Sequence, residues 1–131
     1  MDRAPKLSII LASEELEKVH AASLMGSVAA MSGMEVSLFV TMNALIPFLK
    51  KTAEKQSFKM GEMGTSLLEK TDRFDTLLEN GKALGSLKVY ACALAMDVMG
   101  WTMEDFLPVF DDVIGVTAFF NLAQDGQILT M

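Results

Sequence analysis

Short apolar runs rich in β-forming residues alternate along the chain with stretches of helical periodicity, and this alternation constrains the fold most. The first run, residues 7–12, leads into Ser13 and two glutamates, which suit the N-terminus of a helix. Spacings of three and four then predict a helix to residue 31, with one apolar face formed by Ala21, Leu24, Val28 and Met31. Residues 34–40 predict a second buried strand. Strand, helix and strand in this order form a βαβ unit, whose crossover is almost always right-handed.

The remaining chain continues the alternation. Further strands are expected over residues 87–92, 112–114 and 127–130. Helical segments are expected over residues 43–51, 72–84, 94–99 and 116–124, with Phe74, Leu77, Leu78 and Leu84 on the apolar face of the second. Residues 52–66 show no sustained period and predict a loop, and Gly85 is placed as a left-handed helix cap. The chain is therefore predicted to be a single domain, residues 1–131, with a three-layer α/β/α architecture and a mainly parallel five-stranded sheet.

Composition excludes several classes of protein. One cysteine cannot form an internal disulfide, and no Cys/His cluster could close a zinc site. A net charge of −6 is unsuited to nucleic acid. The longest uncharged stretch, from Ala21 to just before Glu35, is too short to span a bilayer, and residues 1–6 do not resemble a signal peptide. We therefore expect a cytoplasmic protein without membrane insertion. A mean hydropathy of +0.34 suggests that other subunits cover some surface, which predicts a homo-oligomer.

The carboxyl ends of parallel strands are the usual place for a ligand crevice. Ser13 and Glu14 follow the first predicted strand, Asn43 follows the second, and Cys92 ends the third. Backbone N–H groups at a strand-to-helix junction can activate a thiol as a sulfur nucleophile or persulfide carrier. The alternative interpretation is a buried cysteine acting as a small hydrophobic residue.

Residues 88–100 carry the most specific motif of the chain, KVYACALAMDVMG. This segment closely resembles the cysteine segment of DsrE/DsrF-like sulfurtransferases, in the Met-rich branch where the cysteine is followed by Met-Asp-x-Met-Gly. Weaker similarity in the same order covers nearly the whole chain, at residues 12–14, 33–36 with Phe39, 61–65 and 114–119. Residues 93–95 are less polar than the corresponding residues of that family.

The resemblance implies a sulfur relay. Such proteins accept sulfane sulfur as a cysteine persulfide and pass it to a partner thiol, within homo- or hetero-oligomers. Cys92 would be the catalytic residue of a sulfurtransferase. The donor and acceptor would be partner proteins or low-molecular-weight persulfides, because the chain has no second cysteine. The pocket or binding residues would include Ser13, Glu14, Asn43, Met63, Met96 and Asp97.

Other functions remain open or are weaker. A non-catalytic interaction or small-ligand module with the same fold is the main alternative. Peroxidase chemistry is disfavoured because Gly85 and Val89 stand where it requires Pro and Thr. A nucleotide site is also disfavoured, because no Gly-rich loop follows the first predicted strand. We expect no cofactor and no metal: Met60 and Met63 are better explained as a loop covering the crevice, and His20 as a surface or helix-packing residue.

Overall fold

The computed structural model describes residues 4–131, which form one domain around a five-stranded sheet. Residues 1–3, part of the polar N-terminal segment considered above, lie outside the described residues. The strands lie in the order β4-β3-β2-β1-β5, and every pairing is parallel. Their bounds are Lys6–Leu11 (β1), Glu35–Val40 (β2), Ser86–Cys92 (β3), Asp112–Ile114 (β4) and Gln127–Thr130 (β5). The predicted parallel sheet is confirmed, including its short strand at residues 112–114.

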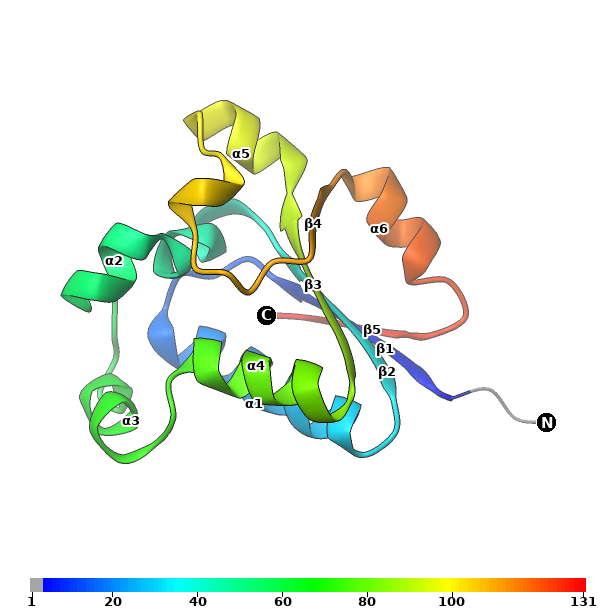
Figure 1. Cartoon of the computed structure of the whole chain (residues 1–131), viewed down its shortest axis with the longest axis horizontal. Helices are drawn as coiled ribbons and strands as arrows, with labels where there is room; N and C mark the ends of the chain where they lie inside the picture. Colours follow the sequence, from blue (N-terminus) through cyan, green and yellow to red (C-terminus); the bar gives the residue numbers. More distant parts are fainter. Residues whose placement is uncertain (1–3) are drawn as a thin grey trace.

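Helices cover both faces of the sheet unequally (Figure 1). Helices α1 (Leu16–Met31) and α4 (Phe74–Leu84) pack together on one face, whereas α6 (Val116–Leu122) covers the other. This arrangement follows from right-handed crossovers, because the chain moves along the sheet in one direction from β1 to β4 and returns past β1 to reach β5. The three-layer α/β/α fold is confirmed.

Five shorter helical segments connect these elements. They are the 3₁₀ helix η1 (Met42–Phe48), α2 (Lys50–Lys55), α3 (Gly64–Lys70), α5 (Ala93–Met99) and the 3₁₀ helix η2 (Met103–Asp105). The prediction of a loop over residues 52–66 is wrong at both ends, where α2 and α3 intrude. Each of these helices has only one to two turns, which is too short to establish a readable apolar period.

The apolar face predicted for α1 is its solvent-exposed face. Leu24, Val28 and Met31 are each more than two-fifths exposed, while α1 packs on the sheet and on α4 with another face. That buried face is rich in small residues, and Gly26 lies so close to the sheet that an added Cβ would stand 3.4 Å from Ile9 Cδ1. Both faces of α1 are apolar, so periodicity alone could not choose between them.

The region around α4 differs from the prediction in three details. The helix begins at Phe74, after Arg73 as its N-cap residue, and not at residue 72, and Leu84 is 73% exposed rather than part of the apolar face. Gly85 is extended, with φ of −150°, instead of left-handed. Glycine is required at this position for steric reasons, because an added Cβ would overlap the backbone carbonyl of Ala30.

Two further predictions concern single features of the described residues. His20 lies on the buried side of α1, where burial lowers its pKa, in agreement with a packing role. Within residues 4–131, no helix is both long enough and apolar enough to cross a membrane.

Candidate functional site

The parallel sheet brings the predicted site segments to one edge. Strands β1, β2 and β3 end at Leu11, Val40 and Cys92, and their register aligns these ends. Cys92 is the last residue of β3 and the N-cap residue of α5, with extended φ and ψ of −73° and 119°. The strand-to-helix junction expected for the cysteine is therefore present.

The Cys92 side chain is fully buried, with an exposed fraction of 0%. Alternation along β3 places it on the face that carries Lys88 and Tyr90, which is the face covered by α6. The strand register sets it beside Ile114 of β4. In this conformation a sulfur donor has no direct route to the thiol.

The cover over this face is weakly anchored. Among its residues Val116–Leu122, α6 buries only one side chain, Phe119, which stacks on Phe39 of β2 with 4.6 Å between ring centroids. The adjacent Phe120 is 48% exposed. Few buried apolar contacts are typical of elements with low local stability.

An apolar cleft of about 170 Å³ lies beside the junction, between η1 and α5. Its walls come from segments that follow β2 and β3, so it occupies the carboxyl edge of the sheet. The lining residues are Met42, Asn43, Ile46, Leu94, Ala95, Val98, Met99 and Trp101. The cleft suits an apolar side chain or ligand, with the Asn43 amide as a polar contact.

Three predicted pocket residues lie near this cleft in different environments. Asn43 lines it. Met96 is buried and helps to hold α5 in place, whereas Asp97 is exposed on α5. Neither of the two lines the cleft, although both belong to the α5 segment.

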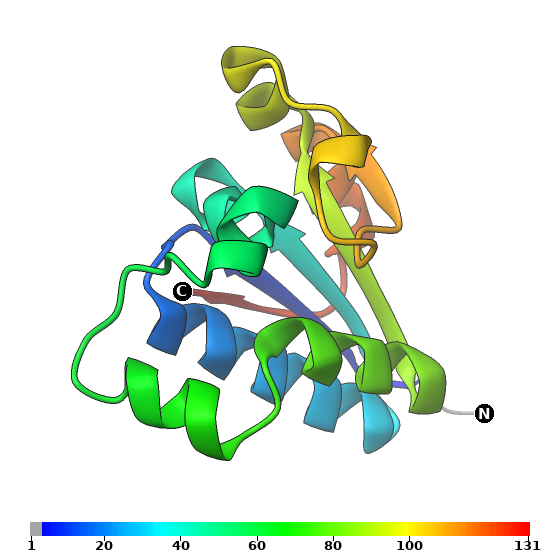
Figure 2. The ribbon, with the colours of Figure 1, turned by 60° about the vertical axis from the view of Figure 1, so that its left-hand side comes forward.

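The other predicted pocket residues gather at the start of α1, by the end of β1. The Ser13 hydroxyl accepts a hydrogen bond from the Glu15 N–H at 3.2 Å, and Glu14 forms an ion pair with Lys59. Met63 is 64% exposed just before α3, which lies beside the first turns of α1 (Figure 2). This group does not join Asn43 and Cys92 in one pocket.

The segment around Met60 and Met63 is fastened to α1. The Lys59 carbonyl accepts the Leu16 N–H at 2.8 Å, and the Glu17 carboxylate accepts the Gly61 N–H at 3.0 Å. The hydrogen bond from Gly61 lowers the pKa of Glu17. This segment does not line the cleft beside Cys92, and its role in covering the carboxyl edge of the sheet stays a prediction.

Most of the cleft could not be found from the sequence. Ile46 and Val98 look like ordinary helix residues, and only folding brings η1 and α5 together. Met42 offered no sequence signal either, although its φ of 52° is unusual for a residue other than glycine. Such left-handed conformations concentrate at functional sites.

The electrostatic surroundings of the site are sparse. Tyr90, two residues before Cys92 on the same face, has its pKa raised by burial and then by Asp111 and Asp112. Its hydroxyl is therefore neutral at neutral pH. Among residues 4–131, no group of three or more His, Cys, Asp or Glu side chains is arranged to hold a metal ion.

Fold and site together define an α/β protein with a single cysteine at the carboxyl edge of a parallel sheet. Residues 60–131, more than half of the chain and including Cys92, match the model of the DsrE/DsrF/DrsH-like family. The chain belongs to this family. No curated protein matches the sequence significantly.

Two solved structures share the fold. The protein of unknown function MTH1491 from Methanobacterium thermoautotrophicum is 11% identical, with a TM-score of 0.63 over 97% of this chain and 99% of its own. The ychN protein from E. coli is 16% identical, with a TM-score of 0.62 over 98% of this chain and 100% of its own. At these identities the similarity concerns the fold.

Proposed function

We propose that this protein is a cytoplasmic sulfur carrier that holds sulfane sulfur as a persulfide on Cys92 and passes it to a partner thiol. The observation that carries the proposal is the position of Cys92, at the end of β3 and inside the segment that matches the DsrE/DsrF/DrsH-like family. The cleft between η1 and α5 would receive an apolar part of the donor or acceptor.

The proposed chemistry consists of two thiol–disulfide-type exchanges. The Cys92 thiolate attacks the terminal sulfur of a donor persulfide, a new S–S bond forms, and the donor sulfur leaves as a thiolate. An acceptor thiolate then attacks the outer sulfur of the Cys92 persulfide and releases the Cys92 thiolate. No net oxidation occurs. The acceptor is another molecule, because the chain contains one cysteine.

Burial of Cys92 makes the proposed reaction dependent on opening. Displacement of α6 would uncover the face on which the thiol lies, and within Val116–Leu122 only the Phe119 side chain is buried. A closed resting state would protect a loaded persulfide from water and from unrelated thiols. Reactivity would therefore follow the population of the opened form.

Intact mass after brief exposure to polysulfide tests the proposal. Folded wild type is expected to gain the mass of one sulfur atom and to lose it again on addition of a small thiol, whereas Cys92→Ala gains nothing. A folded wild type that remains unmodified, while its unfolded form is readily modified, would exclude a carrier role for Cys92 in the isolated chain.

Burial of the thiol favours a second candidate, a non-catalytic binding module. In that case Cys92 is a core residue, and the apolar cleft binds a partner or a small ligand. Substitution of Cys92, compared with substitution in the cleft, separates the two functions. Val98→Asp would abolish partner binding by a module, whereas Cys92→Ala would leave it intact.

A further inference from the structure

The amino-terminal half of the α6 face of the sheet carries polar side chains where a parallel sheet is normally apolar and covered. Helix α6 ends at Leu122 and leaves this part of the face open. The strand register arranges the side chains in two rows across β1, β2 and β3. One row is Lys6, Glu35 and Ser86, and the next is Ser8, Ser37 and Lys88.

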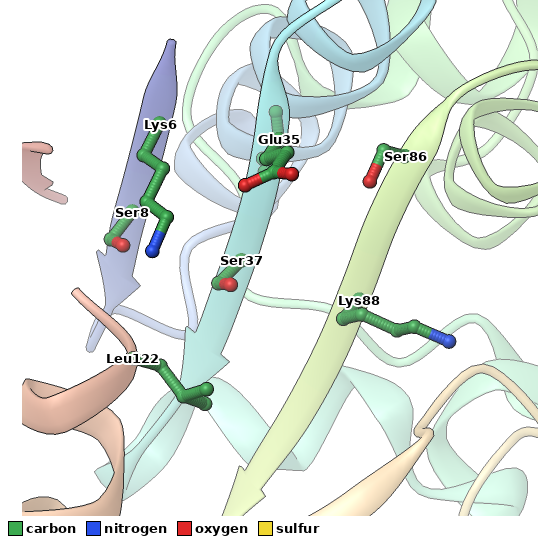
Figure 3. A pocket seen from close by; sticks show the side chains of 8 residues that line it. Lys6, Ser8, Glu35, Ser37, Ser86, Lys88 and Leu122 are labelled. Atoms are coloured by element: carbon green, nitrogen blue, oxygen red, sulfur yellow. The ribbon is translucent and has the colours of Figure 1, made fainter. Parts of the chain in front are cut away.

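These rows line a trough of about 170 Å³, bounded by Leu122 and shown in Figure 3. Its location is separate from Cys92, which ends β3 at the opposite end of the sheet. The trough also differs in character from the cleft beside α5, because most of its lining side chains are charged or carry a hydroxyl. It therefore requires an explanation of its own.

Ser8 is the most buried polar residue that lines the trough. Its exposed fraction is only 2%, yet its hydroxyl takes part in none of the side-chain hydrogen bonds formed within residues 4–131. Among the described residues the fully buried hydroxyl without a partner is that of Ser23, so the Ser8 hydroxyl is open to the trough and not sealed in the core. Because Ser8 lines the trough, its hydroxyl is available for a hydrogen bond to a molecule bound there.

The charged side chains of the trough also lack partners among the described residues. None of the ion pairs within residues 4–131 involves Lys6, Glu35 or Lys88. In Figure 3 the Lys6 ammonium extends toward Ser8, and the Glu35 carboxylate lies between Lys6 and Ser86. The Lys88 ammonium points away from Glu35 and adds a second positive charge at the rim.

We propose that this trough binds a small zwitterion of the α-amino acid type. The ligand carboxylate would lie between the Lys6 ammonium and the hydroxyls of Ser8 and Ser37, and the ligand ammonium would contact Glu35. A simple anion would meet Glu35 without compensation, and a simple cation would meet Lys6. A molecule with both charges satisfies both groups, and the two lysines attract its carboxylate in a protein of net charge −6.

Amide chemical-shift titration of the full ¹⁵N-labelled chain tests this proposal with three probes: glycine, acetate and methylammonium. Glycine is expected to saturate shifts at Ser8, Ser37 and Ser86 and to bind more tightly than acetate or methylammonium. Lys6→Gln is expected to weaken glycine binding roughly tenfold, as loss of a charge-assisted hydrogen bond would. Lys70→Gln, an exposed lysine of α3, serves as the matched control and leaves binding unchanged.

The Glu35→Gln variant supplies the decisive comparison. Removal of the carboxylate is expected to weaken glycine but not acetate, so that the preference between the two probes is lost or reversed. Equal binding of glycine and acetate to wild type would overturn the zwitterion proposal. So would an absence of saturable shifts, or a sedimentation coefficient that changes with Lys6→Gln, because the face would then contact a second copy of the chain. Each outcome is independent of sulfur loading on Cys92.

Discussion

At the scale of single residues, Arg73 connects the start of α4 to α2 through its side chain. The Arg73 guanidinium donates hydrogen bonds to the Asp75 carboxylate at 2.6 and 2.9 Å and to the Ala53 carbonyl at 3.1 Å. Burial raises the pKa of Asp75, but the hydrogen bonds and the charge of Arg73 outweigh it, so that the pKa lies below its usual value. The carboxylate is therefore more stable in the folded than in the unfolded protein.

Asp75→Asn is expected to reduce the free energy of unfolding by about 1–2 kcal/mol at neutral pH. Because the folded pKa is depressed, this contribution is present above the unfolded pKa and disappears as the pH falls through the folded value. Urea unfolding of wild type and variant measures the difference in their free energies of unfolding. The measurements run from about pH 7 to about pH 2, which covers the titration of a carboxyl group. Asp72→Asn is the matched control, because Asp72 forms no ion pair within the described residues. A difference that persists unchanged in acid would contradict this account.

At the scale of elements, Gly85 sets the distance between α1 and the turn from α4 to β3. Gly85→Ala is expected to destabilise the protein by about 1–3 kcal/mol, because the new methyl group overlaps the Ala30 carbonyl. Gly115→Ala is the control, since an added Cβ there meets nothing within 4 Å and its φ of −84° suits any residue. Equal thermal or urea stability of the two variants would show that α1 can shift without cost.

Helix α6 provides a prediction about access to the thiol. Phe119→Leu removes the stacking on Phe39 and should raise the rate of Cys92 alkylation in the folded protein several-fold. Phe120→Leu, on the same helix but half exposed, should leave that rate near the wild-type value. Labelling is followed by intact mass, with circular dichroism to confirm folding. If both variants are labelled at the wild-type rate, α6 is not the cover that controls access.

Sequence patterns predicted the strands more closely than the packing of the helices. Strands β4 and β5 have the predicted bounds, because each is a short run of β-forming residues between turn signals. The packing face of α1 could not be predicted, because both of its faces are apolar and its contacts depend on the small size of residues such as Gly26. The position of Cys92 at the carboxyl edge of the sheet followed from its place at the end of a predicted strand in a parallel sheet. Its burial did not, because it depends on long-range packing across the sheet.

At the scale of the whole molecule, the exposed face of α1 remains unpaired. Leu24, Met25, Val28 and Met31 are each more than two-fifths exposed, and no charged residue lies between Ala21 and Met34. Two copies of an acidic chain could meet there without bringing carboxylates together. We propose this face as the contact of a homo-oligomer.

Sedimentation at micromolar concentration is then expected to give a mass above the 14.3 kDa of one chain. Val28→Glu should lower that mass by placing a charge in the contact. Ser66→Glu, which adds the same charge on exposed α3, should not change it. A wild type that sediments as a single chain at every concentration would rule out self-association through α1.

Transfer of a labelled sulfur atom tests the central claim most directly. Wild-type protein is loaded with ³⁴S-labelled polysulfide, separated from the reagent, and mixed with a small thiol acceptor, and both products are weighed by mass spectrometry. The account predicts that the chain returns to its unmodified mass while the acceptor gains the label, and that Cys92→Ala delivers none. Label that never enters the folded chain, or that reaches the acceptor equally from Cys92→Ala, would contradict a sulfur-carrier function.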